Sequence, residues 1–141
     1  GDHFVSVAPL WQLQLYFAAA RGNDGFYPYI YEQARKDAAD TPHGQLRVAF
    51  CTRAADAVQL DLSEFFVKTG ILAPMNRLVE DYQSHHVTIT REMCEKAIAH
   101  MRQYPKPDSR VIYYISANTF PATAYPSRRL LTTRRMYRRA L

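Results

Sequence analysis

The five histidines are the side chains in this chain best suited to bind a metal or act as a base. They are His3, His43, His85, His86 and His100. A catalytic zinc site of the His-Glu-x-x-His type needs two histidines one helical turn apart, with a glutamate beside the first as general base. None of the five is followed by glutamate. The sequence therefore predicts no zinc-peptidase motif within these 141 residues.

Two looser histidine groupings are also poor candidates for a metal site. His85 and His86 are adjacent, and neighbouring side chains point in different directions on a helix or a strand. Cys94, Glu95 and His100 are close in sequence, but six residues place Cys94 and His100 on different faces of a helix. We predict no metal ligand in the chain.

No nucleophile stands in a recognisable catalytic setting. Ser63 and Ser84 lack the Gly-x-Ser-x-Gly pattern, and neither Cys51 nor Cys94 has a histidine placed to activate it. Both cysteines lie in apolar helical patterns, so we expect buried free thiols. The five glycines are isolated, which excludes a glycine-rich phosphate loop. We predict no catalytic residue and no cofactor in this chain.

The net charge of +5 comes from the end of the chain. Six arginines and no acid follow Asn118, which leaves 12 basic against 13 acidic residues before it. These arginines would occupy several faces of a helix and not one stripe, so a nucleic-acid interface is not predicted. They could bind an acidic partner. No apolar run approaches the roughly 18 residues needed to cross a bilayer, so no membrane span is predicted.

Hydrophobic spacing predicts helices over residues 9–20, 23–37, 41–58, 61–70 and 90–103, with residues 71–88 as a long connection. A short extended piece is expected around 87–89, and another over 111–115. The expected core includes bulky apolar side chains from three of these helices. These are Trp11, Leu13, Phe17, Phe50, Phe65 and Phe66. The chain is expected to be mainly α, an orthogonal bundle of about five helices with a short extended segment near 111–115.

Four stretches carry a family resemblance in their order and spacing. They are Pro9 to Phe17, Asp61 to Gly70, Asp81-Tyr82 and Ile89-Thr90. Together they resemble the C-terminal helical part of the catalytic domain of enhancin-like zinc metallopeptidases, peptidase family M-60, which cut mucin-like glycoproteins. The similarity covers roughly residues 4–118. We therefore expect a helical subdomain over 1–118 and a separate basic tail over 119–141.

The resemblance implies that the parent enzyme holds its zinc in an upstream half, which this non-catalytic part would brace. Asn23, Asp24, Asp81 and Tyr82 would then lie near the substrate cleft. The implied partners are that zinc-binding half and, through it, a mucin-like glycoprotein. The implied location is secreted or at a bacterial cell surface, and a face left exposed in the isolated chain could form a homodimer. A helical interaction module whose Arg-rich tail binds an acidic partner is the alternative.

Overall fold

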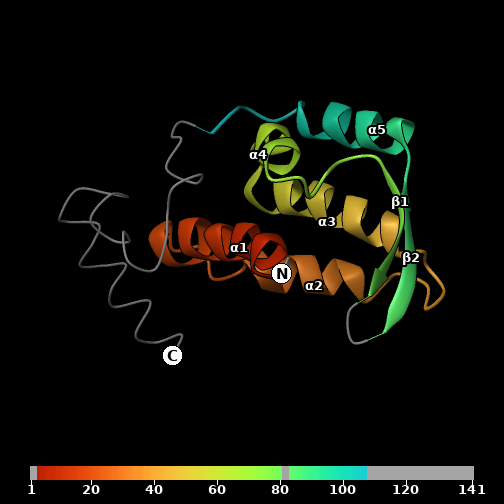
Figure 1. The fold of residues 1–141 in the computed structure, drawn as a ribbon. Coiled ribbons are helices and arrows are strands. Elements are labelled where there is room, and N and C mark those ends of the chain that lie inside the picture. Colours follow the sequence, from red (N-terminus) through yellow and green to blue (C-terminus); the bar gives the residue numbers. More distant parts are fainter. Residues whose placement is uncertain (1–2, 81–82, 108–141) are drawn as a thin grey trace. The chain divides into compact units, whose positions relative to one another are not determined.

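The computed structural model describes residues 3–80 and 83–107, and these are mainly helical with one β-hairpin (Figure 1). The elements in order are α1 (His3–Leu13), the π-helix η1 (Gln14–Ala20), α2 (Phe26–Ala34), α3 (His43–Val58), α4 (Ser63–Lys68), β1 (Met75–Glu80), β2 (Ser84–Ile89) and α5 (Arg91–Met101). The mainly α class is confirmed. The extended segment expected at 111–115 and the basic tail lie outside the described residues. None of the described helices is both long enough and apolar enough to span a bilayer.

The described residues fall into two compact units that divide between Pro28 and Tyr29. The first unit holds α1, η1 and the start of α2. Its first helix begins at His3, so Pro9 lies inside the helix and not in its first turn, where we expected it. The predicted end is confirmed, since Gly22 adopts a positive φ of 69° just after η1.

The π-helix brings consecutive bulky side chains of the first unit into its core. Leu15, Tyr16 and Phe17 are all buried. The Tyr16 ring meets Phe17 edge-on at 4.9 Å, and Phe17 packs against Phe26 at 5.2 Å between ring centroids. The last turn closes with the five-residue hydrogen bond of a π-helix, in which the Arg21 N–H donates to the Tyr16 carbonyl.

Trp11 was expected in the core, and that expectation is wrong. Its side chain is 46% exposed, whereas Leu13 is fully buried. Two residues along an α-helix correspond to a rotation of about 200°, so Trp11 and Leu13 lie on opposite faces. Trp11, Leu13 and Leu15 alternate with glutamines, a pattern that puts apolar residues on one face of a strand but not of a helix, and the chain is helical here.

Helix α3 is central to the second unit, where it contacts both α5 and β2 (Figure 1). It begins two residues later than expected, at His43 with Pro42 as N-cap, and it is followed by Gln59, which adopts a left-handed φ of 52°. Small buried residues at Cys51, Ala54 and Ala55 line its packed face. Small side chains permit close approach of neighbouring elements.

The short helix α4 supplies the aromatic part of this unit's core. Phe65 and Phe66 are buried, and Phe66 meets the half-buried Phe50 edge-on at 6.1 Å. A tight turn leads into α4, in which Asp61 Oδ1 accepts from the Ser63 N–H at 3.0 Å. The Asp61 N–H donates to the Pro105 carbonyl, tying α4 to the end of α5.

Residues 75–89 form an antiparallel hairpin, which corrects the long connection expected there. The short extended piece expected around 87–89 is confirmed as part of β2. The register runs from Met75 opposite Ile89 to Glu80 opposite Ser84. Val87 and Ile89 are buried on one face of the hairpin. The other face carries exposed residues such as Asn76 and Leu78, so the hydrophobic alternation on β1 is weak.

Helix α5 begins as the sequence predicted. Thr90 is its N-cap, and the Thr90 Oγ1 accepts from the Met93 N–H at 3.2 Å. A Glu92–Lys96 ion pair lies on its solvent side, at 3.2 Å. The helix ends at Met101, which is fully buried.

Candidate functional site

The residues predicted to approach substrate are only partly described. Asn23 and Asp24 lie in the first unit, in the loop that joins η1 to α2. The Asn23 backbone spans that loop, because its N–H donates to the Phe17 carbonyl at 3.0 Å and its carbonyl accepts from the Phe26 N–H at 3.1 Å. Asp24 is exposed. Asp81 and Tyr82 fall outside the described residues, so contact of all four with substrate stays a prediction.

The adjacent histidines diverge on the hairpin. His85 stacks on His43 at the start of α3, with 4.0 Å between ring centroids and 26° between ring planes. His86 lies on the opposite face, where its Nε2 contacts the Asn76 side-chain oxygen. Within residues 3–80 and 83–107, no three His, Cys, Asp or Glu side chains gather closely enough to hold a metal. The described residues therefore do not fit the zinc site of a peptidase.

Both cysteines are buried free thiols, as predicted. Burial raises the pKa of Cys51 to about 12, and burial also raises the pKa of Cys94. The Cys51 Sγ donates to the Arg47 carbonyl one turn earlier, at 3.5 Å. Since only the thiolate is an effective nucleophile, these side chains serve packing and not covalent chemistry.

A carboxylate clamp joins α3 to the end of α5. Asp56 Oδ1 accepts from the Tyr104 hydroxyl at 2.7 Å and lies 2.7 Å from His100 Nε2. The hydrogen bond to Asp56 raises the pKa of Tyr104. A carboxylate that orients an imidazole is also part of hydrolase triads, where the imidazole activates a neighbouring hydroxyl or thiol. Among the described residues the hydrogen-bond partners of His100 are Asp56 and Gln103, neither of which is a hydroxyl or a thiol.

A second pair secures the segment after α2 to α3. Arg53 donates from both terminal nitrogens to the two carboxylate oxygens of Asp37, at 2.6 and 2.7 Å. Both side chains are about one-fifth exposed. The hydrogen bonds from Arg53 hold the pKa of Asp37 below its ordinary value. The sequence does not indicate this partner of Arg53, because Asp37 lies 16 residues away, in the segment after α2.

The N-terminal half of α3 carries a different arrangement. Arg47 is half-buried, and its Nε donates to the Ile71 carbonyl at 2.8 Å. One of its terminal nitrogens also reaches the Gly70 carbonyl at 3.4 Å. These acceptors are neutral, so the arginine charge is held in place without an opposing carboxylate. The spacing of His43 and Arg47 would have placed both on one helix face, but only the fold brings the hairpin against it.

Comparison with protein-family models and with curated proteins found no match to this sequence. Two solved structures share its fold. A metallopeptidase from Bacteroides thetaiotaomicron matches with a TM-score of 0.68 and 22% identity, over 85% of this chain and 21% of its own. A metallopeptidase in complex with Tn antigen matches with a TM-score of 0.66 and 21% identity, over 83% of this chain and 24% of its own. This chain thus has the fold of part of a metallopeptidase and spans less than a quarter of either protein.

Proposed function

We propose that this chain is the non-catalytic, C-terminal helical subdomain of a zinc metallopeptidase that acts on mucin-like glycoproteins. In that role it braces the zinc-bearing half of the enzyme and forms part of the substrate cleft. The parent enzyme would be secreted or displayed at a bacterial surface.

The observation that carries the proposal is the fold match and its coverage. Most of this chain superposes on about a fifth of a metallopeptidase, which is the relation expected of one subdomain within a larger enzyme. The second matched metallopeptidase was solved with Tn antigen, which supports a glycoprotein as substrate. Tight packing around Phe65 and Phe66 suits a scaffold.

The side chains of this chain support a role without catalysis. The described residues hold no metal-ligand group, their thiols are buried, and the Asp56–His100 pair lacks a nucleophile. Zinc, when bound elsewhere in the parent, would supply the activation of water. This subdomain would contribute position and shape through α3 and its neighbours.

The first test is whether the two parts work together. The zinc-bearing part, identified by a His-Glu-x-x-His motif in the same reading frame, would be expressed with and without this segment and supplied with a Tn-bearing glycopeptide. We expect hydrolysis only when both are present and none from this chain alone. Full activity of the zinc-bearing part by itself would refute the bracing role, and a reading frame without the motif would refute the peptidase assignment.

The second test addresses the cleft. In the assembled enzyme, Asp24→Ala should raise KM with little change in kcat if this loop contacts substrate in its ground state. Asp40→Ala is the matched control, because Asp40 is also an exposed loop aspartate but lies in the second unit. Equal KM values for wild type and Asp24→Ala would show that this loop does not contact substrate in the cleft. The bracing role would then stand on the first test alone.

A further inference from the structure

We propose that four side chains of the second unit form a binding site for a small oxyanion, either a carboxylate or a sulfate. We name them the cationic cluster. It consists of His43 and Arg47 on α3, Arg77 on β1 and His85 on β2.

Helix α3 and strand β2 bring three members of this cluster together, namely His43, Arg47 and His85. His43 and Arg47 are four residues apart, so they share one face of α3. His85 stacks on His43 at 4.0 Å between ring centroids. The contact is close because Gly44 has no side chain: a Cβ there would lie 1.9 Å from the Thr88 carbonyl oxygen of β2. The helix backbone therefore lies directly against the strand.

The hairpin register places Arg77 on the same side as His85. Arg77 pairs with Val87, and Val79 pairs with His85. Directly opposed residues share a face of an antiparallel pair, and alternate residues of one strand do too. The buried Val87 and the stacked His85 mark this face as the one turned toward α3, so Arg77 lies on it as well.

The charges of this cluster are not compensated within the described residues. Arg47 hydrogen bonds only to carbonyls, and the exposed Arg77 has no acidic partner among them. Burial lowers the pKa of Arg47, and the nearby charge of Arg77 lowers it further. Four other cations of the second unit pair with acids, in Arg35–Glu32, Arg53–Asp37, Lys68–Glu64 and Lys96–Glu92, whereas Arg47 and Arg77 lie near each other without an acid in the described part of the chain. The contrast points to a ligand that supplies the missing negative charge.

The geometry favours an oxyanion over a simple halide. Guanidinium groups present planar, forked donors that match the paired oxygens of a carboxylate or sulfate. The Arg47 fork is already fixed by the Ile71 carbonyl, so little conformational entropy is lost on binding. Imidazole nitrogens of His43 and His85 can donate to further oxygens. That the oxyanion belongs to an acidic glycan rests on the proposed function above.

The site can be tested by NMR with the full 141-residue chain. Sodium sulfate and sodium N-acetylneuraminate would be titrated separately, with sodium chloride holding the ionic strength constant, while the arginine Nε–Hε resonances are followed. We expect saturable shifts for Arg47 and Arg77. The tighter of the two probes identifies the source as a sulfate ester or a sialic acid carboxylate. Absence of saturation by both would overturn the proposal.

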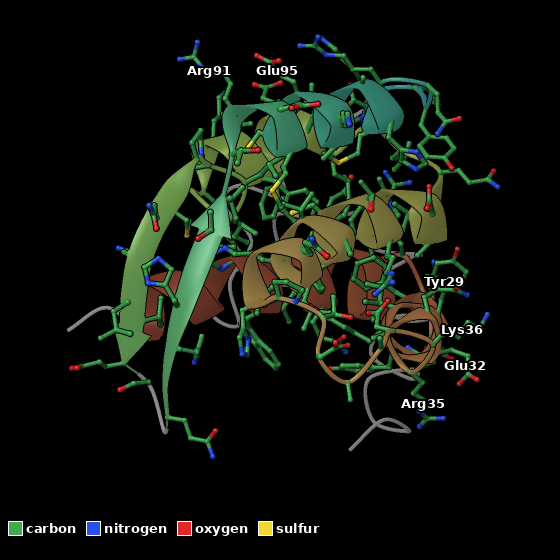
Figure 2. The ribbon with its side chains drawn as sticks, turned by 90° about the vertical axis from the view of Figure 1, so that its right-hand side faces the viewer. Tyr29, Glu32, Arg35, Lys36, Arg91 and Glu95 are labelled. Atoms are coloured by element: carbon green, nitrogen blue, oxygen red, sulfur yellow. The ribbon has the colours of Figure 1, made fainter. Side chains whose placement is uncertain are left out.

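Two variants with the same change in charge distinguish binding at this site from a nonspecific effect of net charge. Arg77→Gln should weaken binding of the tighter-binding probe about tenfold, which corresponds to the loss of one charge-assisted hydrogen bond. Arg35→Gln, at an exposed residue just after α2 (Figure 2), should leave the affinity for that probe unchanged. Equal losses in both variants would overturn the site. Arg77→Lys keeps the positive charge but loses the forked guanidinium donors. Its affinity for this probe should lie between those of wild type and Arg77→Gln. These titrations need no hydrolysis, so their failure would leave the peptidase assignment to its own tests.

Discussion

Replacing Gly44 with alanine tests the packing on which the second unit depends. At an exposed helical position this change would stabilise the chain by about 1 kcal/mol, because alanine is the better helix former. Here the new Cβ would lie 1.9 Å from the Thr88 carbonyl oxygen and 2.7 Å from its carbonyl carbon. Both neighbours are backbone atoms of β2, which no rotamer change can move. The sign of the effect is therefore expected to reverse.

The magnitude follows from how far the strand must withdraw. Ordinary Cβ contacts are not shorter than 3.0 Å, so α3 and β2 must separate by about an ångström. Overpacking of this kind costs about 1–3 kcal/mol, and a backbone neighbour puts Gly44→Ala at the upper end. After the helix gain is subtracted, about 2 kcal/mol of destabilisation remains. For a unit of this size the Tm should fall by roughly 10 °C.

Thermal and urea denaturation followed by circular dichroism would measure this loss. Gly25→Ala is the matched control, because a Cβ there meets only the Asn23 side-chain oxygen, at 3.6 Å. It should change stability by less than about 0.5 kcal/mol. A Gly44→Ala variant more stable than wild type would refute the close approach of α3 to β2. The same variant should also weaken oxyanion binding, since it would part His43 from His85.

Three other predictions concern side chains whose surroundings the fold defines. Trp11→Ala should cost about 1–2 kcal/mol, well below the roughly 3–5 kcal/mol of Phe66→Ala, because the indole is nearly half exposed; equal losses in urea denaturation would place Trp11 in the core. Asp37 has a lowered folded-state pKa, so its contribution to stability is present above the ordinary aspartate pKa of 3.8 and is lost as pH falls through the lower folded value. The stability difference between wild type and Asp37→Asn should therefore shrink below pH 3.8, and a constant difference would contradict the Arg53 pairing. Cys51, with a pKa of about 12, should react with a thiol reagent only after unfolding; rapid labelling of the native chain would contradict its burial.

The helix boundaries that the sequence predicted well are those with a local signal at that boundary. Thr90 caps α5 through its own hydroxyl, and Gly22 and Gly70 adopt the positive φ that ends a helical segment. Each signal involves residues within a few positions of one another. Local hydrogen bonding decides such boundaries, so one sequence is enough to place them.

The errors came from patterns with two physical meanings. Pro9 is favourable in a first turn, yet here it lies within α1, which begins at His3. The alternation from Trp11 to Phe17 is typical of a strand, yet the π-helix buries Leu15, Tyr16 and Phe17 in succession. The wider turn of a π-helix changes which residues share a face, and no residue type predicts where a π-helix forms.

The hairpin was missed for a related reason. Its outer face is polar, so β1 has little of the alternation that marks a half-buried strand. The stability of β2 comes instead from α3, whose Gly44 gives the Thr88 backbone room. A glycine inside a helix is normally read as a local weakness. Its actual role here becomes visible only when the distant strand is placed beside it.

The two halves of α3 differ in a way that bears on function. Toward its end, Arg53 pairs with Asp37 and Asp56 contacts His100. Removing one member of either pair would leave the other without its charged or hydrogen-bonded partner. At its start, Arg47 faces only carbonyls while Arg77 adds a second positive charge nearby. Like charges placed near each other repel, so a supporting role alone does not explain the proximity of Arg77 to Arg47. The satisfied end of α3 is best explained as scaffold and the unsatisfied end as a place for a negatively charged ligand.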